Sequence, residues 1–508
     1  MSQIKAGALI SYLTLTISVL VTLLYTPFMI RLLGQAEYGL YALIGSLAAY
    51  LSIMDLGLGN SIIRFTARNR ELGDKKAEAN LNGLFIVFYI IIGLLTLVIG
   101  SIIYVNVDNI FDTSFTSSEI KKAKIMIAIL TLNFAVSFPM SVFGAIIQAY
   151  EKFVITKLVA LFRTIAIPIG TIPFLIFGFG SIAMVIISSI INISCLVFSM
   201  YYCKKNIGIK IQYGKIEKRT VKEILNYSFF VFLGIIIDQI YWNTDQFILG
   251  IVAGTIPVAV YAIAMLFIKL YMQLSASISG LFLPRVSIMV AKKVADIELS
   301  KMMIKYGRLQ FVLISYILGG FTLYGQSFIY LWAGKGYENA YFIVLIIMIP
   351  LSIPLIQTIG ISILYAKNLQ GFRSLTLISI SIINVIISIP LAREFGGIGT
   401  AFATAFTLIL GNIFIMNIYY QKKIGLDMIS FWKNIIKMSI PALMAIVISC
   451  MINIFIRTDN IIVYLVEIFS YSLIFLALIW RFGLNYYEKN LISSSIKILL
   501  YRMKIISK

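Results

Sequence analysis

Residues 81–104 read LNGLFIVFYIIIGLLTLVIGSIIY, a run without a single charged side chain. A helix needs about 20 mostly apolar residues to cross the roughly 30 Å hydrocarbon core of a bilayer, and this run is long enough. The whole chain has the same character, because 60% of its 508 residues are hydrophobic, 12% are charged and the mean hydropathy is +0.97. Soluble domains average about 45–50% apolar and 25% charged residues. The sequence therefore predicts an all-α integral membrane protein.

Apolar segments of this kind recur along the chain and predict about fourteen transmembrane helices. They begin near Ala8, Gly39, Leu81, Ile125, Phe153, Ser181, Ile224, Ile256, Ile304, Tyr341, Leu375, Gly396, Ile435 and Ile461. The first segment is long and lacks a small-residue cleavage site, so we interpret it as an uncleaved signal anchor.

The residue content excludes several kinds of site. The chain has no His, which removes His-based catalysis and His-ligated metals. Cys195, Cys203 and Cys450 show no CxxC spacing, which favours core thiols over a zinc site or a disulfide framework. A GxxxxGK[ST] phosphate loop is also missing from the sequence, so we expect transport energy to come from ions or substrate instead of ATP hydrolysed by this chain.

The basic residues predict the orientation of the chain, because Lys and Arg are enriched on the cytoplasmic side of membrane proteins. With the N-terminus in the cytoplasm, the inner segments hold 33 of the 42 Lys and Arg, and the outer loops hold 7. Both termini are then cytoplasmic, and the net charge of +21 is explained by topology without a nucleic-acid partner. The basic loop from Lys204 to Lys222 is interpreted as a linker lying on anionic headgroups, or alternatively as a plain topology determinant.

Two stretches repeat at an offset of 220: residues 33–42 read LGQAEYGLYA and residues 253–262 read AGTIPVAVYA. GFGS at 178–181 and GIGT at 397–400 match at an offset of 219. Six spans separate the copies, which predicts a parallel repeat with a binding site between its halves. We therefore predict two pseudo-symmetric six-helix lobes with two extra C-terminal helices. The domain bounds are an N-terminal lobe at 1–203, a basic cytoplasmic linker at 204–223, a C-terminal lobe at 224–420, and the last two spans with a basic tail at 421–508.

Charged side chains inside the predicted spans are candidates for a substrate or ion site. Such a charge costs at least about 2.5–3.5 kcal/mol at mid-membrane, so it is retained where it faces a cavity or a partner. Asp238 and Asp245 lie seven residues apart in one span and share a helix face with Trp242. We interpret this stripe as a cavity lining, with Trp242 binding substrate and the two acids as ion-coupling candidates. Lys269 is a substrate-binding candidate, and the alternative is a structural ion pair with one of these acids.

Glycines late in the second span suggest a second candidate segment. Residues 55–59 read DLGLG, and such glycines can loosen a helix and let a ligand approach the backbone. Asp55, Asn60 and Arg64 are therefore substrate-binding candidates, and the alternative is that the span ends early with Asp55 as a cap. Arg163, about ten residues into the fifth span, is deep enough to meet a diphosphate, or else it snorkels to the inner surface.

The first 80 residues also carry four short motifs, which are RLLG at 31–34, EYGLY at 37–41, DLGLG at 55–59 and GD at 73–74. With the fourteen-span plan and the Pro284–Arg285 exit from the eighth span, the chain resembles Wzx-type polysaccharide flippases over essentially its whole length. That family belongs to the MOP superfamily, with the MATE drug exporters and the lipid II flippases, so the resemblance implies a MATE/MOP-like fold. By the motif match, it implies that Arg31 and the residues from Asp55 to Arg64 contact substrate. The alternative for Arg31, which lies at the end of a span, is contact with a lipid headgroup.

The resemblance implies translocation of undecaprenyl-diphosphate-linked oligosaccharide across the bacterial inner membrane by alternating access. The two lobes would rock around a cavity that shields the glycan and the diphosphate while the polyprenyl tail stays in lipid. A diphosphate requires cations, for which arginine offers bidentate geometry. We expect no cofactor and no metal, apart from coupling to Na⁺ or H⁺. The expected partners are the lipid-linked oligosaccharide, membrane lipids and other polysaccharide assembly proteins, and no nucleic acid.

Three alternatives remain open. A MATE-like antiporter of drugs or cations shares the fold, although its acidic mechanism fits less well with a first span that carries no charge before Arg31. A lipid II flippase is nearest in function, but we expect it to have a denser basic cavity in its N-terminal spans. A membrane enzyme such as an O-antigen polymerase or ligase needs catalytic residues in a large outer loop, and the loop at about 104–124 shows no such constellation. We expect that the chain is not an enzyme.

Overall fold

The structure is a computed structural model that describes residues 3–279, 283–455, 461–491 and 493–494. Every regular element in these residues is a helix. The chain forms two compact units: the first unit is residues 1–262 with 385–400, and the second unit is residues 263–384 with 401–508. The predicted lobe and linker bounds divide the chain differently, and they stay a prediction.

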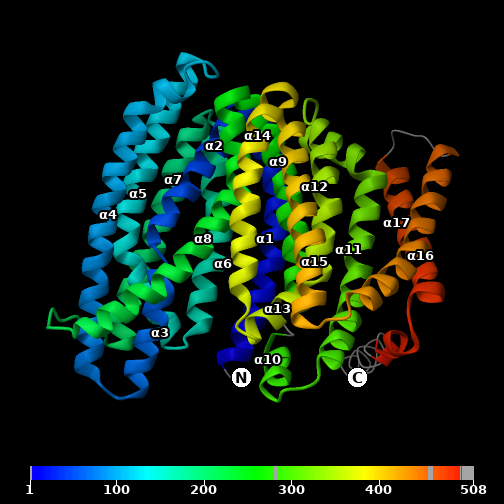
Figure 1. The fold of residues 1–508 in the computed structure, drawn as a ribbon. Coiled ribbons are helices and arrows are strands. Elements are labelled where there is room, and N and C mark those ends of the chain that lie inside the picture. Colours follow the sequence, from blue (N-terminus) through cyan, green and yellow to red (C-terminus); the bar gives the residue numbers. More distant parts are fainter. Residues whose placement is uncertain (1–2, 280–282, 456–460, 492, 495–508) are drawn as a thin grey trace, which may run out of the picture. The chain divides into compact units, whose positions relative to one another are not determined.

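The first unit is built from long helices that pack lengthwise. They are α1 (Gln3–Leu33), α2 (Gln35–Ser52), the 3₁₀ turn η1 (Ile53–Asp55), α3 (Leu58–Glu71), α4 (Lys75–Phe111), α5 (Ser117–Ala149), α6 (Phe153–Ile176), α7 (Gly180–Tyr202), the π turn η2 (Cys203–Ile207), α8 (Lys218–Ala253), the start of α9 (Thr255–Ser279) and part of α14 (Gln370–Leu408). α4 packs along α5, α5 along α7 and α1 along α6, and Figure 1 shows α4 and α5 side by side. The buried rings of Phe85, Tyr89 and Phe138 lie in the core between α3, α4 and α5.

The second unit is organised around α11. It holds the rest of α9 and α14 and the elements α10 (Leu283–Ala291), α11 (Asp296–Ala333), α12 (Asn339–Ile356), α13 (Thr358–Ala366), η3 (Ile409–Ile415), α15 (Met416–Tyr419), η4 (Tyr420–Ile424), α16 (Met428–Phe455), α17 (Ile461–Leu478) and η5 (Ile479–Gly483). α11 packs against α12, α16 and α17, and α10 packs against α13. Rings of Tyr324, Tyr471 and Phe475 fill the core between α11 and α17.

The number of spans agrees with the prediction from hydropathy. Thirteen helices in the described ranges are long and apolar enough to cross a membrane, and one of them runs over residues 370–424. That helix is interrupted at Gly396, whose backbone is non-helical with φ 56° and ψ −135°. Because only glycine adopts such a conformation readily, the break divides this segment into two spans and brings the count to fourteen.

The first pair of repeated turns adopts one backbone conformation. Gly34, between α1 and α2, has φ 77° and ψ 168°, and Gly254, between α8 and α9, has φ 83° and ψ −170°. The second pair differs, because the positive φ falls on Gly178 and Gly180 in the first copy but on Gly396 in the other. The repeat is therefore visible in the backbone at the first pair of turns and not at the second.

The basic segment before α8 lies against α4. The Gln212 amide donates to the carbonyl oxygen of Ala79 at 3.0 Å, and the Asn82 side chain donates to the carbonyl oxygen of Lys210 at 3.2 Å. A Cβ on Gly83 would overlap the carbonyl oxygen of Gln212, so glycine allows this close approach. The segment that the charge pattern predicts to be a linker is thus attached to protein through its backbone.

Candidate functional site

The predicted break in the second span is present, and it orients Asp55. Leu56 and Gly57 both have positive φ, 52° and 72°, so the helix ends at η1 and restarts as α3. The Asp55 carboxylate accepts a hydrogen bond from the Tyr89 hydroxyl at 2.6 Å and lies 3.5 Å from the Gly59 amide. The bond to the buried Tyr89 thus fixes the Asp55 side chain at the break, and both its substrate-binding role and its role as a cap stay predictions.

One face of α3 lies antiparallel to the start of α8 and contacts it at three successive levels. The contacts pair a small hydroxyl with a hydroxyl, a guanidinium with an aromatic ring, and a guanidinium with a carboxylate. They are Ser61 with Ser228 at 2.6 Å between hydroxyl oxygens, Arg64 with the Tyr227 ring at 4.6 Å from its centroid, and Arg68 with Glu223 at 3.5 Å. Gly57 continues this approach, because a Cβ there would lie 2.8 Å from the Ser228 carbonyl oxygen.

Arg64 differs from the residues around it on this face. Its guanidinium is exposed, lies over the Tyr227 ring and makes no ion pair with any described residue. Asn60, one turn earlier, is also exposed. Because a ring holds only one face of the guanidinium, its in-plane N–H groups stay available to an anion.

The two other predicted arginines lie on different helices. Arg31 is exposed in the last turn of α1. Arg163 is half-buried on α6, and its buried Nε has no hydrogen-bond partner among the described residues. A buried donor of this kind is costly unless an acceptor reaches it, so Arg163 keeps its place as a candidate for an anionic ligand.

The acidic stripe on α8 divides into an exposed and a buried end. Asp238 is exposed, whereas Asp245 is buried and accepts hydrogen bonds from the hydroxyls of Tyr261 at 2.9 Å and Ser388 at 2.7 Å. Trp242 is half-buried between them and lies edge-on to the Tyr241 ring at 5.1 Å. The shared helix face is therefore present, but the two carboxylates have different surroundings.

The predicted residues do not form one cluster within the first unit. Ser228 on α8 contacts α3, the helix that carries Arg64. Asp245 lies 17 residues farther along α8, which is about 25 Å along a helix axis. Lys269 is an exposed residue of α9 in the second unit. That Arg163, Asp238, Asp245 and Lys269 line one cavity stays a prediction.

A polar cluster at the starts of α2 and α5 was not predicted from the sequence. The Glu37 carboxylate accepts from Lys122 at 2.6 Å and from the backbone and hydroxyl of Ser181 at 2.7 and 2.9 Å. Glu119 accepts from the Thr255 hydroxyl at 2.7 Å, beside a cavity of about 470 Å³. Glu37 and Thr255 belong to the two repeated stretches, which is the sequence signal that indicates this cluster.

A second polar cluster lies at the start of α4. The Tyr150 hydroxyl donates to the carboxylate of Glu78 at 2.6 Å, and the Arg70 guanidinium lies 5.0 Å from the Tyr150 ring. Burial and this hydrogen bond raise the pKa of Tyr150 to about 12. The tyrosine therefore stays protonated and acts as a donor at any physiological pH.

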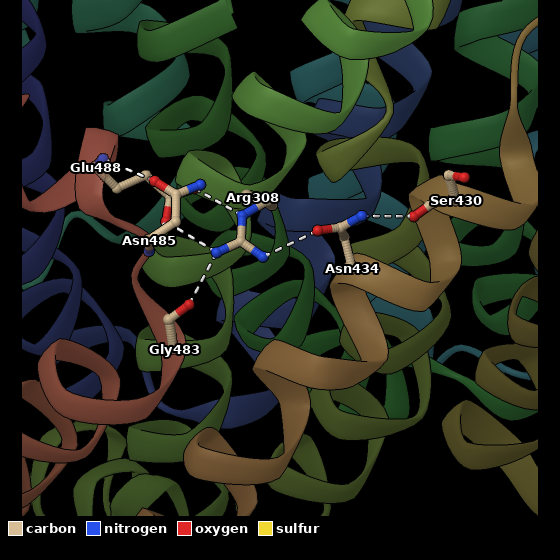
Figure 2. A network of polar contacts seen from close by, with 6 residues as sticks. All are labelled: Arg308, Ser430, Asn434, Gly483, Asn485 and Glu488. Carbon is tan, nitrogen blue, oxygen red and sulfur yellow. Dashed lines mark hydrogen bonds and ion pairs between the residues drawn. The ribbon is translucent and has the colours of Figure 1, made fainter.

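The second unit contains a buried ion pair that joins its C-terminal segment to α11. Arg308 contacts both carboxylate oxygens of Glu488, at 2.7 and 2.9 Å, and also the Gly483 carbonyl and the Asn434 side chain. Figure 2 shows the guanidinium between these partners. No local pattern in the sequence marks this pair, because the two residues lie 180 positions apart.

The fold is similar to solved transporter structures. It matches a structure titled "Lipid II flippase MurJ, inward closed conformation" with a TM-score of 0.74 at 16% identity, over 93% of this chain and 97% of that chain. It matches an inward-facing multidrug resistance MATE family transporter of the MOP superfamily with a TM-score of 0.59 at 15% identity, over 80% and 99% of the two chains. The predicted all-α, MATE/MOP-like fold is confirmed.

Sequence comparison gives the family. The chain is 22% identical over 452 residues to "Uncharacterized membrane protein EpsK" of Bacillus subtilis (strain 168), covering 83% of each chain. It is 23% identical over 400 residues to the "Putative O-antigen transporter" of Shigella flexneri, covering 77% of this chain and 92% of that one. The profile described as "Polysaccharide biosynthesis protein" matches residues 4–290, more than half of the chain. The family match confirms the predicted resemblance to a polysaccharide biosynthesis family, and the chain belongs to the polysaccharide biosynthesis protein family.

Proposed function

We propose that this multi-pass membrane protein is a flippase that moves undecaprenyl-diphosphate-linked oligosaccharide repeat units across the bacterial cytoplasmic membrane by alternating access. The observation that carries the proposal is the family match over residues 4–290. A relative named as an O-antigen transporter and a lipid II flippase fold support it. These relatives are transport proteins, which supports a transporter and not an enzyme.

The chemistry of the cargo agrees with the cationic residues. A sugar headgroup cannot cross hydrocarbon unaided, and its diphosphate needs charge-assisted hydrogen bonds once it leaves water. Arg64 offers exposed donors, and Arg163 offers a buried donor without a protein acceptor among the described residues. We assign these two arginines, with Arg31, to the diphosphate.

We propose further that both termini face the cytoplasm and that the flippase has no cofactor. In this proposal an ion gradient drives the transport cycle, with Asp238 and Asp245 as the coupling carboxylates. Membrane lipids and other polysaccharide assembly proteins are its proposed partners.

The test is transport by the purified chain in proteoliposomes. A fluorescent undecaprenyl-diphosphate oligosaccharide is followed with and without a Na⁺ or H⁺ gradient, and ethidium efflux is measured in parallel vesicles. Translocation that depends on the protein, without ethidium efflux, is the expected result. Gradient-driven ethidium efflux without lipid translocation would assign the chain to the MATE-like antiporters instead.

Variants place the cargo site in the same assay. Arg163→Ala and Asp238→Ala should lower the rate of translocation. Lys157→Ala removes a charge from the same helix as Arg163 and serves as the matched control. Equal rates in Arg163→Ala and Lys157→Ala would refute the role given to Arg163.

A further inference from the structure

A cavity of about 530 Å³ lies between α3, α4 and α8 within the first unit. Its volume falls in the range of ligand-binding pockets. Nine of its lining residues are apolar, and two are polar: Leu56, Leu58, Phe88, Ile91, Ile92, Leu95, Leu225, Asn226, Ser228, Phe229 and Phe232. The hydroxyl of Ser228 already bonds to Ser61, so Asn226 is the one lining side chain with polar atoms left for a ligand.

The cavity is elongated along the helices. Its wall on α4 runs from Phe88 to Leu95, about 10 Å along the helix axis. Ile91, Leu95 and Phe229 are each about half exposed although they line it, so the cavity is open at the surface of the protein. This shape suits a flexible apolar chain lying along the helices.

The end of the groove at Asn226 is cationic. Arg64 lies over the ring of Tyr227, which is next to Asn226, and it makes no ion pair with a described residue. Arg68 and Lys222 add positive charge at the same end, and Glu223, which pairs with Arg68, offsets one of these charges. Net positive charge favours a multiply charged headgroup, such as a diphosphate, over the single charge of a phospholipid phosphodiester.

We infer that this groove, which we call the α4–α8 groove, binds the isoprenoid chain of a polyprenyl diphosphate, with its diphosphate held by the guanidinium of Arg64. The groove continues from the headgroup end into the membrane, so one amphiphile can satisfy both the apolar wall and the arginine. The inference rests on the proposed function, because it assigns the carrier part of the proposed cargo to a defined surface.

The test measures binding and translocation separately. The purified chain in lipid nanodiscs is labelled with a polyprenyl diphosphate that carries a photoreactive group on its chain, and the labelled peptides are mapped. We expect labelling on residues 88–95 and 225–232, with competition by unlabelled polyprenyl diphosphate and not by phosphatidylglycerol. Equal competition by phosphatidylglycerol would show an ordinary lipid-facing surface and overturn the inference.

Two substitutions on α4 give a matched pair. Ile91→Trp fills the groove, whereas Leu94→Trp places the same ring on an equally exposed position that does not line it. We expect Ile91→Trp to lower labelling about tenfold and Leu94→Trp to leave it unchanged. Equal labelling in the two variants would refute the groove.

The headgroup end has its own pair. Arg64→Gln should weaken binding of the diphosphate lipid about tenfold, the loss expected for a charge-assisted contact. Lys157→Gln changes the same charge elsewhere in the unit and should leave binding unchanged. Equal affinity in Arg64→Gln and wild type would refute the assignment of the diphosphate.

The outcomes also separate this inference from the proposed function. If the wild-type chain translocates the lipid-linked oligosaccharide and Ile91→Trp binds and translocates as well as wild type, the proposed function stands and the groove assignment is refuted. If the chain binds polyprenyl diphosphate specifically at the groove but translocates nothing, the groove assignment stands and the proposed function is refuted.

Discussion

Removal of the Arg308 guanidinium should destabilise the second unit strongly, because it leaves a carboxylate buried. The side chains of Arg308 and Glu488 are 6% and 1% exposed, and two N–H groups of the arginine reach both oxygens of the acid. In Arg308→Met, the Asn485 amide remains 2.8 Å from one Glu488 oxygen, and the other oxygen loses its donor. Breaking a buried pair of this kind costs about 3–5 kcal/mol. That is roughly a 140- to 4,000-fold change in the folding equilibrium.

The double variant tests the physical reason for this cost. Replacing both charges, in Arg308→Met with Glu488→Met, removes the unpaired charge as well as the pair, so it should cost less than the two single changes added together. The free energy of unfolding is measured by reversible titration of detergent-solubilised protein with sodium dodecyl sulfate. Arg481→Met, which removes an exposed arginine near the same segment, is the control and should lie within about 0.5 kcal/mol of wild type. Single variants as stable as that control, or additive single and double changes, would refute the reasoning.

Three further predictions concern the first unit and the topology. Gly39→Ala should destabilise by about 1–3 kcal/mol, because its Cβ would overlap the Thr255 carbonyl oxygen, whereas Gly45→Ala on the same helix meets open space and should be neutral in the same unfolding titration. Tyr89→Phe should cost about 1.5–3 kcal/mol by removing the donor to the Asp55 carboxylate, and an unfolding midpoint equal to wild type would contradict it. In a cysteine-free background, an impermeant maleimide should label Lys335→Cys in intact cells and Lys215→Cys only after permeabilisation; the opposite pattern would invert the topology.

Composition and hydropathy predict the spans because the membrane imposes a local rule on the sequence. Each span must be apolar over its own length, so the starts of all fourteen segments can be read without knowing the fold. The break at Gly396 was predicted in the same way, as a boundary between two apolar runs. Glycine also indicates the break after Asp55, although the sequence did not decide between a cap and a ligand site.

The partners of the polar residues could not be predicted, because they lie far apart along the chain. Asp245 bonds to Tyr261, 16 residues away, and to Ser388, 143 residues away. Arg64 lies over Tyr227, whose position becomes relevant only when α3 packs antiparallel to α8. Periodicity places such residues on a helix face, but it does not specify which face of another helix they meet.

The most direct test of the proposed function is how much lipid-linked oligosaccharide crosses the bilayer. Vesicles are prepared with a fluorescent undecaprenyl-diphosphate oligosaccharide in both leaflets, and an impermeant reductant is added outside. Protein-free vesicles should lose about half of the fluorescence, because their inner leaflet is protected. Vesicles that contain the chain should lose nearly all of the fluorescence, because lipid from the inner leaflet is moved outward to the reductant. Arg64→Gln should slow this loss from the inner leaflet. A loss of about half with the wild-type chain present would contradict the assignment as a flippase.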